Sequence, residues 1–183
     1  MNFITKTKNL KYAKKLYNTA FPKYERIPYF ILKLFTINKK VKFTEYYDNN
    51  AFVGITYTAE TEYTLYLYYF AINDNLRGKG YGSKILNHLK TTYPNKTITL
   101  SIEPLDENST NYNDRLRRYE FYLKNGFSNS GYTVYEVGGG FTVLYTKTNI
   151  DNDKTFTFNA QEFVKVFKKL SGGFIRAKIE KTK

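Results

Sequence analysis

The spacing of hydrophobic residues changes character along the first half of the chain and separates helical from strand segments. In "NLKYAKKLYNTAF", residues 9–21, apolar positions recur every three or four residues, which predicts a helix with its lysines facing solvent. A second helix is predicted over "PYFILKLF", residues 28–35, where the proline suits a first helical turn. Residues 2–6 are expected to form a short strand. Between residues 41 and 72, three runs rich in β-branched and aromatic residues predict an antiparallel meander.

The pattern in the second half predicts a strand–helix–strand unit, another helix and a hairpin. A helix is expected from Tyr81 to about Thr92, followed by a strand over "TITLSIE", residues 97–103. Residues 114–127 predict a helix whose core face carries Leu116, Tyr119 and Leu123. Two further strands, "YTVYEV" and "FTVLYTKT", are separated by three glycines and read as a hairpin.

The last residues differ in character from the rest. A polar link over residues 149–154 precedes a capping pattern, Asn159 with Glu162, and an amphipathic helix. Residues 174–181 alternate like an edge strand. The inward side of the helix is predicted to carry Phe163, Val166, Phe167 and Leu170.

Because a soluble monomer rarely exposes a continuous apolar stripe, this helix should be covered. We therefore expect a main domain over residues 1–148 and an extension over residues 149–183. The extension would pack on that domain or on a second copy, which would make a homodimer.

Composition narrows the classes of function. At 183 residues with 42% hydrophobic positions, the chain can bury one sizeable core. It has no cysteine and one histidine, His88, so disulfides, thiolate nucleophiles and a metal site are not expected. The apolar runs fall short of the ~20 residues that a membrane span needs, and the N-terminus lacks a signal-peptide pattern. We expect a cytoplasmic protein with no membrane association.

The formal net charge of +13 favours anionic ligands. Lysines occur throughout the chain and no nucleic-acid-binding motif accompanies them, so nucleic acid is not expected as the main partner. Like charges at an entrance would repel polyamines and strongly cationic antibiotics. A peptide amine, or a neutral or acidic small amine, would be accepted more readily.

The stretch "FAINDNLRGKGYGSKIL", residues 70–86, places three glycines between a strand and a helix. A helix N-terminus presents unpaired N–H groups and a positive dipole end, and glycine lets a phosphate approach that backbone. The basic side chains of Arg77 and Lys79 and the Ser83 hydroxyl add to the same turn. The alternative is that the glycines only make a tight turn.

Glycine spacing selects among phosphate-binding loops. The third glycine comes one residue early for Gly-x-Gly-x-x-Gly, and Gly82-Ser83-Lys84 has the wrong order for a Walker loop. What the stretch contains is Arg-x-x-Gly-x-Gly, read as Arg77, Gly80 and Gly82. In this respect the chain resembles the GNAT superfamily of N-acetyltransferases, whose acyl-CoA pyrophosphate loop has that signature.

Two further segments support the resemblance, which covers residues 1 to about 147. "RRYEFYLKNGF", residues 117–127, resembles the second family motif, and "FPKYERIPYFIL", residues 21–32, resembles the first-helix segment of small bacterial members. Many members carry Asn seven residues before the motif tyrosine, where this chain has Arg115. The nearby Asn111 is the substitute that we expect for that contact.

The resemblance implies a mixed α/β (α+β) fold: a twisted, mostly antiparallel sheet flanked by helices, here with an appended C-terminal helix and strand. It also implies an acyl-CoA-dependent N-acetyltransferase, with acetyl-CoA as cosubstrate and direct attack by an amine in a ternary complex. The pantetheine arm would lie along Phe70, Ala71 and Ile72. The pyrophosphate would lie against the backbone and side chains of Arg77, Gly78, Lys79, Gly80, Tyr81, Gly82 and Ser83.

Three side chains are candidates for proton transfer. The resemblance singles out Tyr122 as the general acid, because a neutral phenol can protonate the departing thiolate. Glu25 and Glu103 are candidates for the base that deprotonates the amine, and an ordinary solvated carboxylate remains open for each. The other classes of function are a non-catalytic acyl-CoA-binding or regulatory module and a basic domain that interacts with protein or nucleic acid.

Overall fold

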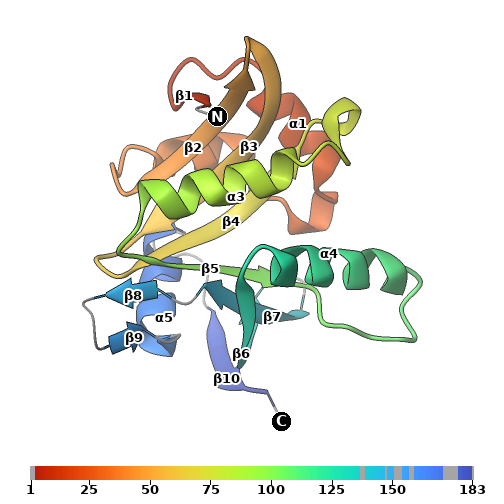
Figure 1. The fold of residues 1–183 in the computed structure, drawn as a ribbon, viewed down its shortest axis with the longest axis vertical. Coiled ribbons are helices and arrows are strands. Elements are labelled where there is room, and N and C mark those ends of the chain that lie inside the picture. The colour runs from red at the N-terminus through yellow and green to blue at the C-terminus, as the bar shows by residue number, and fades with distance from the viewer. Residues whose placement is uncertain are drawn as a thin grey trace.

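An eight-stranded sheet in the order β1-β2-β3-β4-β5-β7-β6-β10 forms the centre of the molecule (Figure 1). The computed structural model describes residues 3–136, 139–146, 148–150, 154–156, 159–170 and 177–182. Of the neighbouring pairs in this sheet, β4–β5 is parallel and the others are antiparallel. The predicted fold class is therefore confirmed. The strands are β1 (Ile4–Lys6), β2 (Val41–Asp48), β3 (Ala51–Glu60), β4 (Thr64–Ile72), β5 (Thr97–Ile102), β6 (Phe127–Glu136), β7 (Gly139–Thr146) and β10 (Lys178–Lys181).

Helices cover both faces of the sheet. On one face lie α1 (Ala13–Ala20), α2 (Tyr29–Phe35) and α5 (Ala160–Leu170), which contribute Leu16, Leu32 and Phe163 to one buried cluster. On the other lie α3 (Tyr81–Thr92) and α4 (Tyr112–Lys124), which pack on a second cluster around β5 and β7. Figure 1 shows α3 and α4 in front of the sheet and α5 behind it. Each helix therefore buries one apolar stripe against the strands.

The first helix begins later than its periodicity predicts. The pattern starts at residue 9, but Asn9 has a left-handed backbone (φ 53°) and α1 begins at Ala13. The fully buried Glu45 of β2 accepts hydrogen bonds from the backbone N–H groups of Tyr12 (2.6 Å) and Ala13 (2.5 Å). Its other carboxylate oxygen accepts one from the Tyr47 hydroxyl (2.6 Å). A carboxylate from a neighbouring strand thus takes the place of a local N-cap.

An irregularity in β4 turns two successive side chains to the same face. The register places Tyr57 opposite Tyr69 but Thr58 opposite Leu67, so a bulge falls at Tyr68. Both Tyr68 and Tyr69 consequently pack against the cluster that contains α1 and α5. A bulge changes the alternation of side chains in this way because it inserts one residue into one strand.

Strands β4 and β5 stay paired only at their beginnings. The parallel ladder joins residues 64–66 to residues 97–99, although β4 continues to Ile72 and β5 to Ile102. Beyond Tyr66 the two strands part. One edge of β4 is thereby left with backbone groups that β5 does not use.

The C-terminal segment contacts the rest of the sheet at two places. Phe163 and Val166 of α5 are fully buried, and the Phe163 ring lies 4.9 Å from that of Tyr66. Strand β10 pairs with β6, with Ile179 opposite Val134. The predicted inward side chains of Phe167 and Leu170 lie outside the described residues. The division of the chain at residue 148 stays a prediction.

The link predicted over residues 149–154 is bordered by regular structure. Strand β8 (Thr148–Ile150) pairs with β9 (Lys154–Phe156) in a separate two-stranded sheet. The predicted link was therefore wrong at residues 149, 150 and 154, which lie in these strands, and the polar neighbours of the β-branched Ile150 concealed its preference for a strand. Among the described residues, no helix has the length and hydropathy to cross a membrane.

The cap on α1 yields a prediction about stability. Glu45→Gln should lower the free energy of unfolding by about 2 kcal/mol, because an amide keeps only one oxygen for three donors and loses the charge. Urea denaturation would measure the change. The matched variant Glu62→Gln, at an exposed turn, should change it by less than about 0.5 kcal/mol. Equal stability of the two variants would contradict a capping role for Glu45.

Candidate functional site

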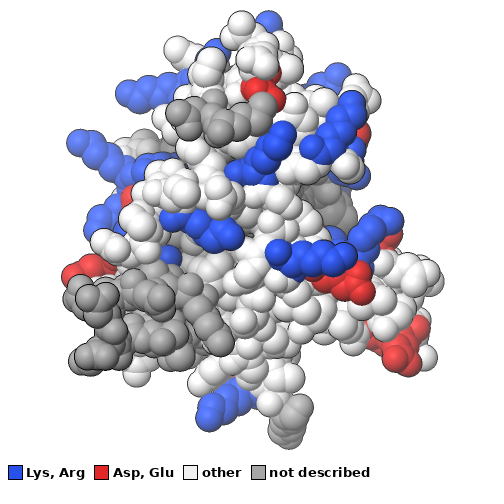
Figure 2. Space-filling view, viewed as in Figure 1, with Lys and Arg blue, Asp and Glu red and all other residues white. Residues whose placement is uncertain are grey.

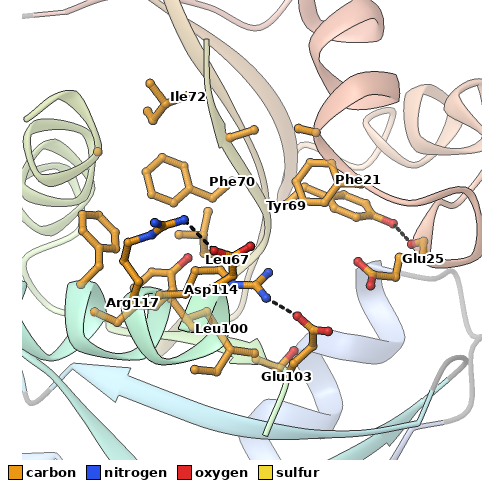
Figure 3. A pocket seen from close by; sticks show the side chains of 18 of the residues that line it. Phe21, Glu25, Leu67, Tyr69, Phe70, Ile72, Leu100, Glu103, Asp114 and Arg117 are labelled. Carbon is orange, nitrogen blue, oxygen red and sulfur yellow. Dashed lines mark hydrogen bonds and ion pairs between the residues drawn. The ribbon is translucent and has the colours of Figure 1, made fainter. Parts of the chain in front are cut away.

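A cavity of about 870 Å³ lies where β4 and β5 part (Figure 3). Its floor includes Leu67 and Leu100, one from each of these strands. The remaining walls come from the loop before α3, the beginnings of α3 and α4, the 3₁₀ turn Lys23–Glu25 and the end of β6. Segments that are distant in the sequence therefore meet in one space.

The loop that precedes α3 presents backbone N–H groups to this cavity. Gly78 (φ 73°) and Gly80 (φ 77°) are both left-handed, and no side chain caps the helix. The first N–H of α3 with a helical acceptor is that of Lys84, which bonds to the Gly80 carbonyl (3.1 Å). The preceding N–H groups are thus available for an anion, beside the Arg77 guanidinium. That guanidinium pairs with Asp74 at 2.8 Å on the exposed surface.

The third glycine of the loop is required by packing as well. A Cβ atom on Gly82 would lie 2.9 Å from Cζ of Phe121 on α4. The absence of a side chain therefore lets the first turn of α3 pack against α4, in addition to any approach by a ligand. Gly78 and Gly80 have open space around the position of a Cβ, so only their backbone conformation requires glycine.

Two arginines and an amide hold the carboxylate of Glu103 at the end of β5. Arg115 lies 3.4 Å from one oxygen and Arg118 contacts the other. The Asn111 side chain donates to Glu103 (3.3 Å) and accepts from Nε of Arg115 (2.7 Å). Arg115, at the position where the family motif has Asn, thus supports a cavity carboxylate that has a cation at each oxygen.

Glu25 extends into the cavity from the 3₁₀ turn. The Tyr69 hydroxyl donates to its backbone carbonyl (2.8 Å) and accepts from the backbone N–H of Ile27 (3.2 Å), as the dashed line in Figure 3 marks for the first bond. Burial and the Glu103 carboxylate raise the pKa of Glu25, and Arg118 and a hydrogen bond from Tyr24 act in the opposite direction. The backbone of Glu25 is therefore fixed by hydrogen bonds. Its carboxylate is partly buried, and the nearby Arg118 only partly offsets the effects of burial and of Glu103 on its pKa.

Glu136, at the end of β6, is a third carboxylate in the cavity and was missed by the sequence analysis. The Tyr68 hydroxyl donates to its Oε2 (2.9 Å). Burial raises the pKa of Glu136 to about 7; the bond from Tyr68 lowers it and the Glu25 carboxylate adds to the increase. No local pattern marks this residue, because its place depends on the bulge in β4 and the register of the β6–β7 hairpin.

Tyr122 lies at the cavity wall on α4. Its ring packs against those of Phe121 (centroids 5.2 Å apart) and Phe127 (5.5 Å). Burial raises the pKa of the Tyr122 phenol to about 12, although Arg118 opposes the shift. The predicted core stripe of this helix was wrong at Leu123, which is 41% exposed. The helix meets the core with Tyr119, Phe121 and Tyr122 because it packs at the edge of the sheet.

The sequence-predicted site residues meet in this cavity with one exception. Within residues 3–136, which the structure describes without a gap, Lys79 is the predicted residue that does not line it. The lining residues that were predicted are Glu25, Phe70, Ala71, Ile72, Arg77, Gly78, Gly80, Tyr81, Gly82, Ser83, Glu103, Asn111 and Tyr122. Their chemical roles stay predictions.

The charges within the cavity are segregated, unlike those on the surface. Figure 2 shows Lys and Arg scattered over the visible face rather than gathered in one patch. Inside, Arg77 and Arg117 lie on the side of α3 and α4, where Arg77 pairs with Asp74 and Arg117 with Asp114. Glu25 and Glu136 lie on the opposite side, without an arginine or lysine in an ion pair among the described residues. In Figure 3, Arg117 and Glu25 occupy opposite ends of the labelled group. The arrangement suits an anion at one end and a cation at the other.

Comparisons with known proteins show which sequences resemble the domain that contains this cavity. Residues 39–129 match a family profile described as an acetyltransferase (GNAT) domain. YjbC of Bacillus subtilis (strain 168), named as an acetyltransferase, is 37% identical over 62 residues, or 34% of this chain. The match spans 31% of the length of that relative.

Solved structures share the fold. A GNAT-family protein of Bacteroides thetaiotaomicron has a TM-score of 0.65 at 24% identity, over 84% of this chain and 90% of its own. An aminoglycoside 6'-N-acetyltransferase complexed with coenzyme A has a TM-score of 0.63 at 16% identity, over 84% of this chain and all of its own (100%). At these identities, the likeness is one of fold.

The pKa of Glu136 predicts how stability depends on pH. The pKa is raised from 4.5 to about 7 on folding, so the folded chain holds this proton more tightly. The contribution of Glu136 to the free energy of unfolding is fully present below about pH 4.5. It is lost as the pH rises to about 7, which lowers the free energy of unfolding by an amount on the order of 3 kcal/mol. Glu136→Gln cannot ionise and should lose less stability between pH 5 and pH 8 than the unmodified chain. Urea denaturation at both values checks this.

The control for this titration is Glu107→Gln, which removes an exposed carboxylate. This variant should keep the pH dependence of the unmodified chain. The same dependence in Glu136→Gln would rule out a raised pKa at Glu136.

Proposed function

The chain belongs to the GNAT family of acetyltransferases, and we propose that it transfers an acetyl group from acetyl-CoA to an amine by direct attack in a ternary complex. The observation that carries the proposal is the cavity between β4 and β5, with an N–H-rich, cationic end and a carboxylate-lined end. An anionic acyl donor and an amine would each meet complementary charge there.

Acetyl-CoA fits the α3 side of the cavity. The N–H groups before Lys84 and the Arg77 side chain would bind its pyrophosphate, as helix N-termini bind phosphate generally. The free edge of β4 beyond Tyr66 offers backbone groups of Phe70, Ala71 and Ile72 to the amides of the pantetheine arm. Coenzyme A in the structure of the aminoglycoside acetyltransferase, which shares the fold, supports this assignment.

Glu136 is the side chain best suited to act as the base. A general base is most effective when its pKa lies near the working pH, and that of Glu136 is about 7. The ammonium form of the substrate would transfer one proton to Glu136, and the neutral nitrogen would attack the thioester carbonyl carbon. A backbone N–H of β4 would polarise that carbonyl as negative charge develops on its oxygen. Glu103 is less suited because Arg115 and Arg118 occupy its two carboxylate oxygens.

Collapse of the tetrahedral intermediate breaks the carbon–sulfur bond and requires a proton for the thiolate. Tyr122 lines the cavity and its raised pKa keeps the phenol protonated at neutral pH. It would donate that proton to the sulfur, whose thiol has a pKa of ~8.5. The nitrogen is cationic after its attack and would release its second proton to solvent, from which Tyr122 regains a proton. The products are the acetylated amine and coenzyme A.

Binding of acetyl-CoA can be tested with two valine variants. Gly80→Val should weaken binding at least tenfold, because a left-handed residue that is β-branched would distort the anion-binding loop. Gly131→Val is the matched control: Gly131 has the same sign of φ (72°) and open space, but lies in β6 away from the cavity. Calorimetry would measure both. Equal affinities would remove the loop from the binding site.

The role of Tyr122 can be tested by removing one oxygen atom. Tyr122→Phe should lower kcat about 10²-fold, as expected for a positioned acid, with little change in affinity for acetyl-CoA. Tyr119→Phe makes the same change on the same helix outside the cavity lining and should retain activity. Release of free thiol with a panel of amines would be measured from pH 6 to 9. Unchanged kcat in Tyr122→Phe would exclude it as the acid, and binding without turnover in the unmodified chain would indicate a non-catalytic module.

A further inference from the structure

We propose that the acceptor is an amine carrying a second cationic group, and that Glu25 binds this second group while the first amine reacts. The inference rests on the proposed function and extends it to the class of substrate. It depends on how the four carboxylates of the cavity are partnered, on the way the backbone of Glu25 is held and on the aromatic side chains around it.

The four carboxylates that line the cavity have unequal partners. Asp114 pairs with Arg117 at 2.8 Å. Glu103 is neutralised by Arg115 and Arg118. Among the described residues, no ion pair joins Glu25 or Glu136 to a lysine or arginine, and these two carboxylates interact unfavourably with each other. In a chain with a formal net charge of +13, this side of the cavity therefore keeps two acidic groups without a cation of their own. A bound cation would offset the free-energy cost of burying the two carboxylates and would reduce the repulsion between them.

The reacting amine satisfies only one of the two carboxylates. It must be neutral when it attacks, so the proton taken by Glu136 removes one negative charge and one positive charge together. Glu25 then remains in a partly desolvated place, where burial and the Glu103 carboxylate raise its pKa and the Arg118 charge only partly opposes them. A second ammonium or guanidinium group on the same substrate would supply a further positive charge throughout the reaction.

Glu25 is held in position before any substrate binds. Its backbone N–H donates to the Pro22 carbonyl (3.1 Å), and its own carbonyl accepts from Tyr69 (2.8 Å). The Tyr17 hydroxyl fixes the same segment through the Ile27 carbonyl (2.8 Å). The backbone of Glu25 is therefore already ordered, and binding a ligand would restrict only the rotamers of its side chain.

Aromatic rings form the wall beside Glu25. Phe21 and Tyr69 pack edge to face at 4.8 Å, and Tyr24 lines the cavity although it is 70% exposed. Aromatic faces attract alkylammonium groups and cover the methylene chain between two amines. This local environment reverses the expectation drawn from net charge, which disfavoured polyamines and other cationic acceptors. The charges that line the cavity act on the substrate at shorter range than the dispersed surface lysines.

Binding experiments can test the inference without turnover. Calorimetry on the protein saturated with coenzyme A would compare α,ω-diamines of three to six carbons with monoamines of the same lengths. At least one diamine should bind tenfold or more tightly than its monoamine, and Glu25→Gln should abolish this difference. Glu62→Gln, which removes an exposed carboxylate elsewhere, should preserve it. Equal binding of every matched pair, or a preference unchanged in Glu25→Gln, would overturn the proposal.

Kinetics separates this proposal from the proposed function. If both hold, Glu25→Gln should raise KM for the preferred diamine at least tenfold more than KM for the monoamine of the same length, whereas any change in kcat should be common to both substrates. A Glu25-dependent preference in binding, with no turnover of any amine, would refute the acetyltransferase activity and keep the cation site. Turnover that is equal for diamines and monoamines, and insensitive to Glu25→Gln, would refute the cation site and keep the activity.

Discussion

The parting of β4 from β5 is the constraint on which the site depends. Two parallel strands that stayed paired along their length would fill the space now occupied by the cavity and would use every backbone group of β4. Because pairing ends at Tyr66, residues 67–72 keep one edge free, and the helices α3 and α4 bridge the opening on one face. The cavity thus passes between two strands of one sheet, and side chains from both faces of the sheet can line it.

The bulge at Tyr68 determines what the second face contributes. With regular alternation, Tyr68 and Tyr69 would point to opposite faces. With the bulge, both point toward α1 and β6, where one hydroxyl binds the Glu136 carboxylate and the other binds the Glu25 backbone. The strand that would hold the acyl donor is therefore linked by two hydrogen bonds to both acidic groups on the acceptor side. Substitution of either tyrosine would therefore remove a hydrogen bond to an acidic residue on a different element.

Local patterns predicted the elements well and their long-range partners poorly. The helix over Tyr81–Thr92 and the glycine loop were predictable because capping, periodicity and left-handed turns are properties of neighbouring residues. Local patterns did not predict where α1 starts, that Glu136 lines the cavity, or that Leu123 is exposed. Each depends on a segment more than ten residues away: a carboxylate on β2, a bulge on β4, and the packing of α4 at the sheet edge. The net charge of the chain likewise averages over the surface and does not indicate that Glu25 and Glu136 line the cavity.

The capping of α1 by Glu45 has a consequence for the order in which the chain folds. A helix of eight residues without a local cap is too short to persist by itself in water. The carboxylate that completes α1 lies more than thirty residues further along the chain, on a strand that is itself stabilised by pairing with β3. During synthesis, the segment before Ala20 must therefore remain without stable helical structure until β2 has left the ribosome and joined the meander. Helix α1 therefore becomes stable only after a strand that follows it in the chain has joined the meander.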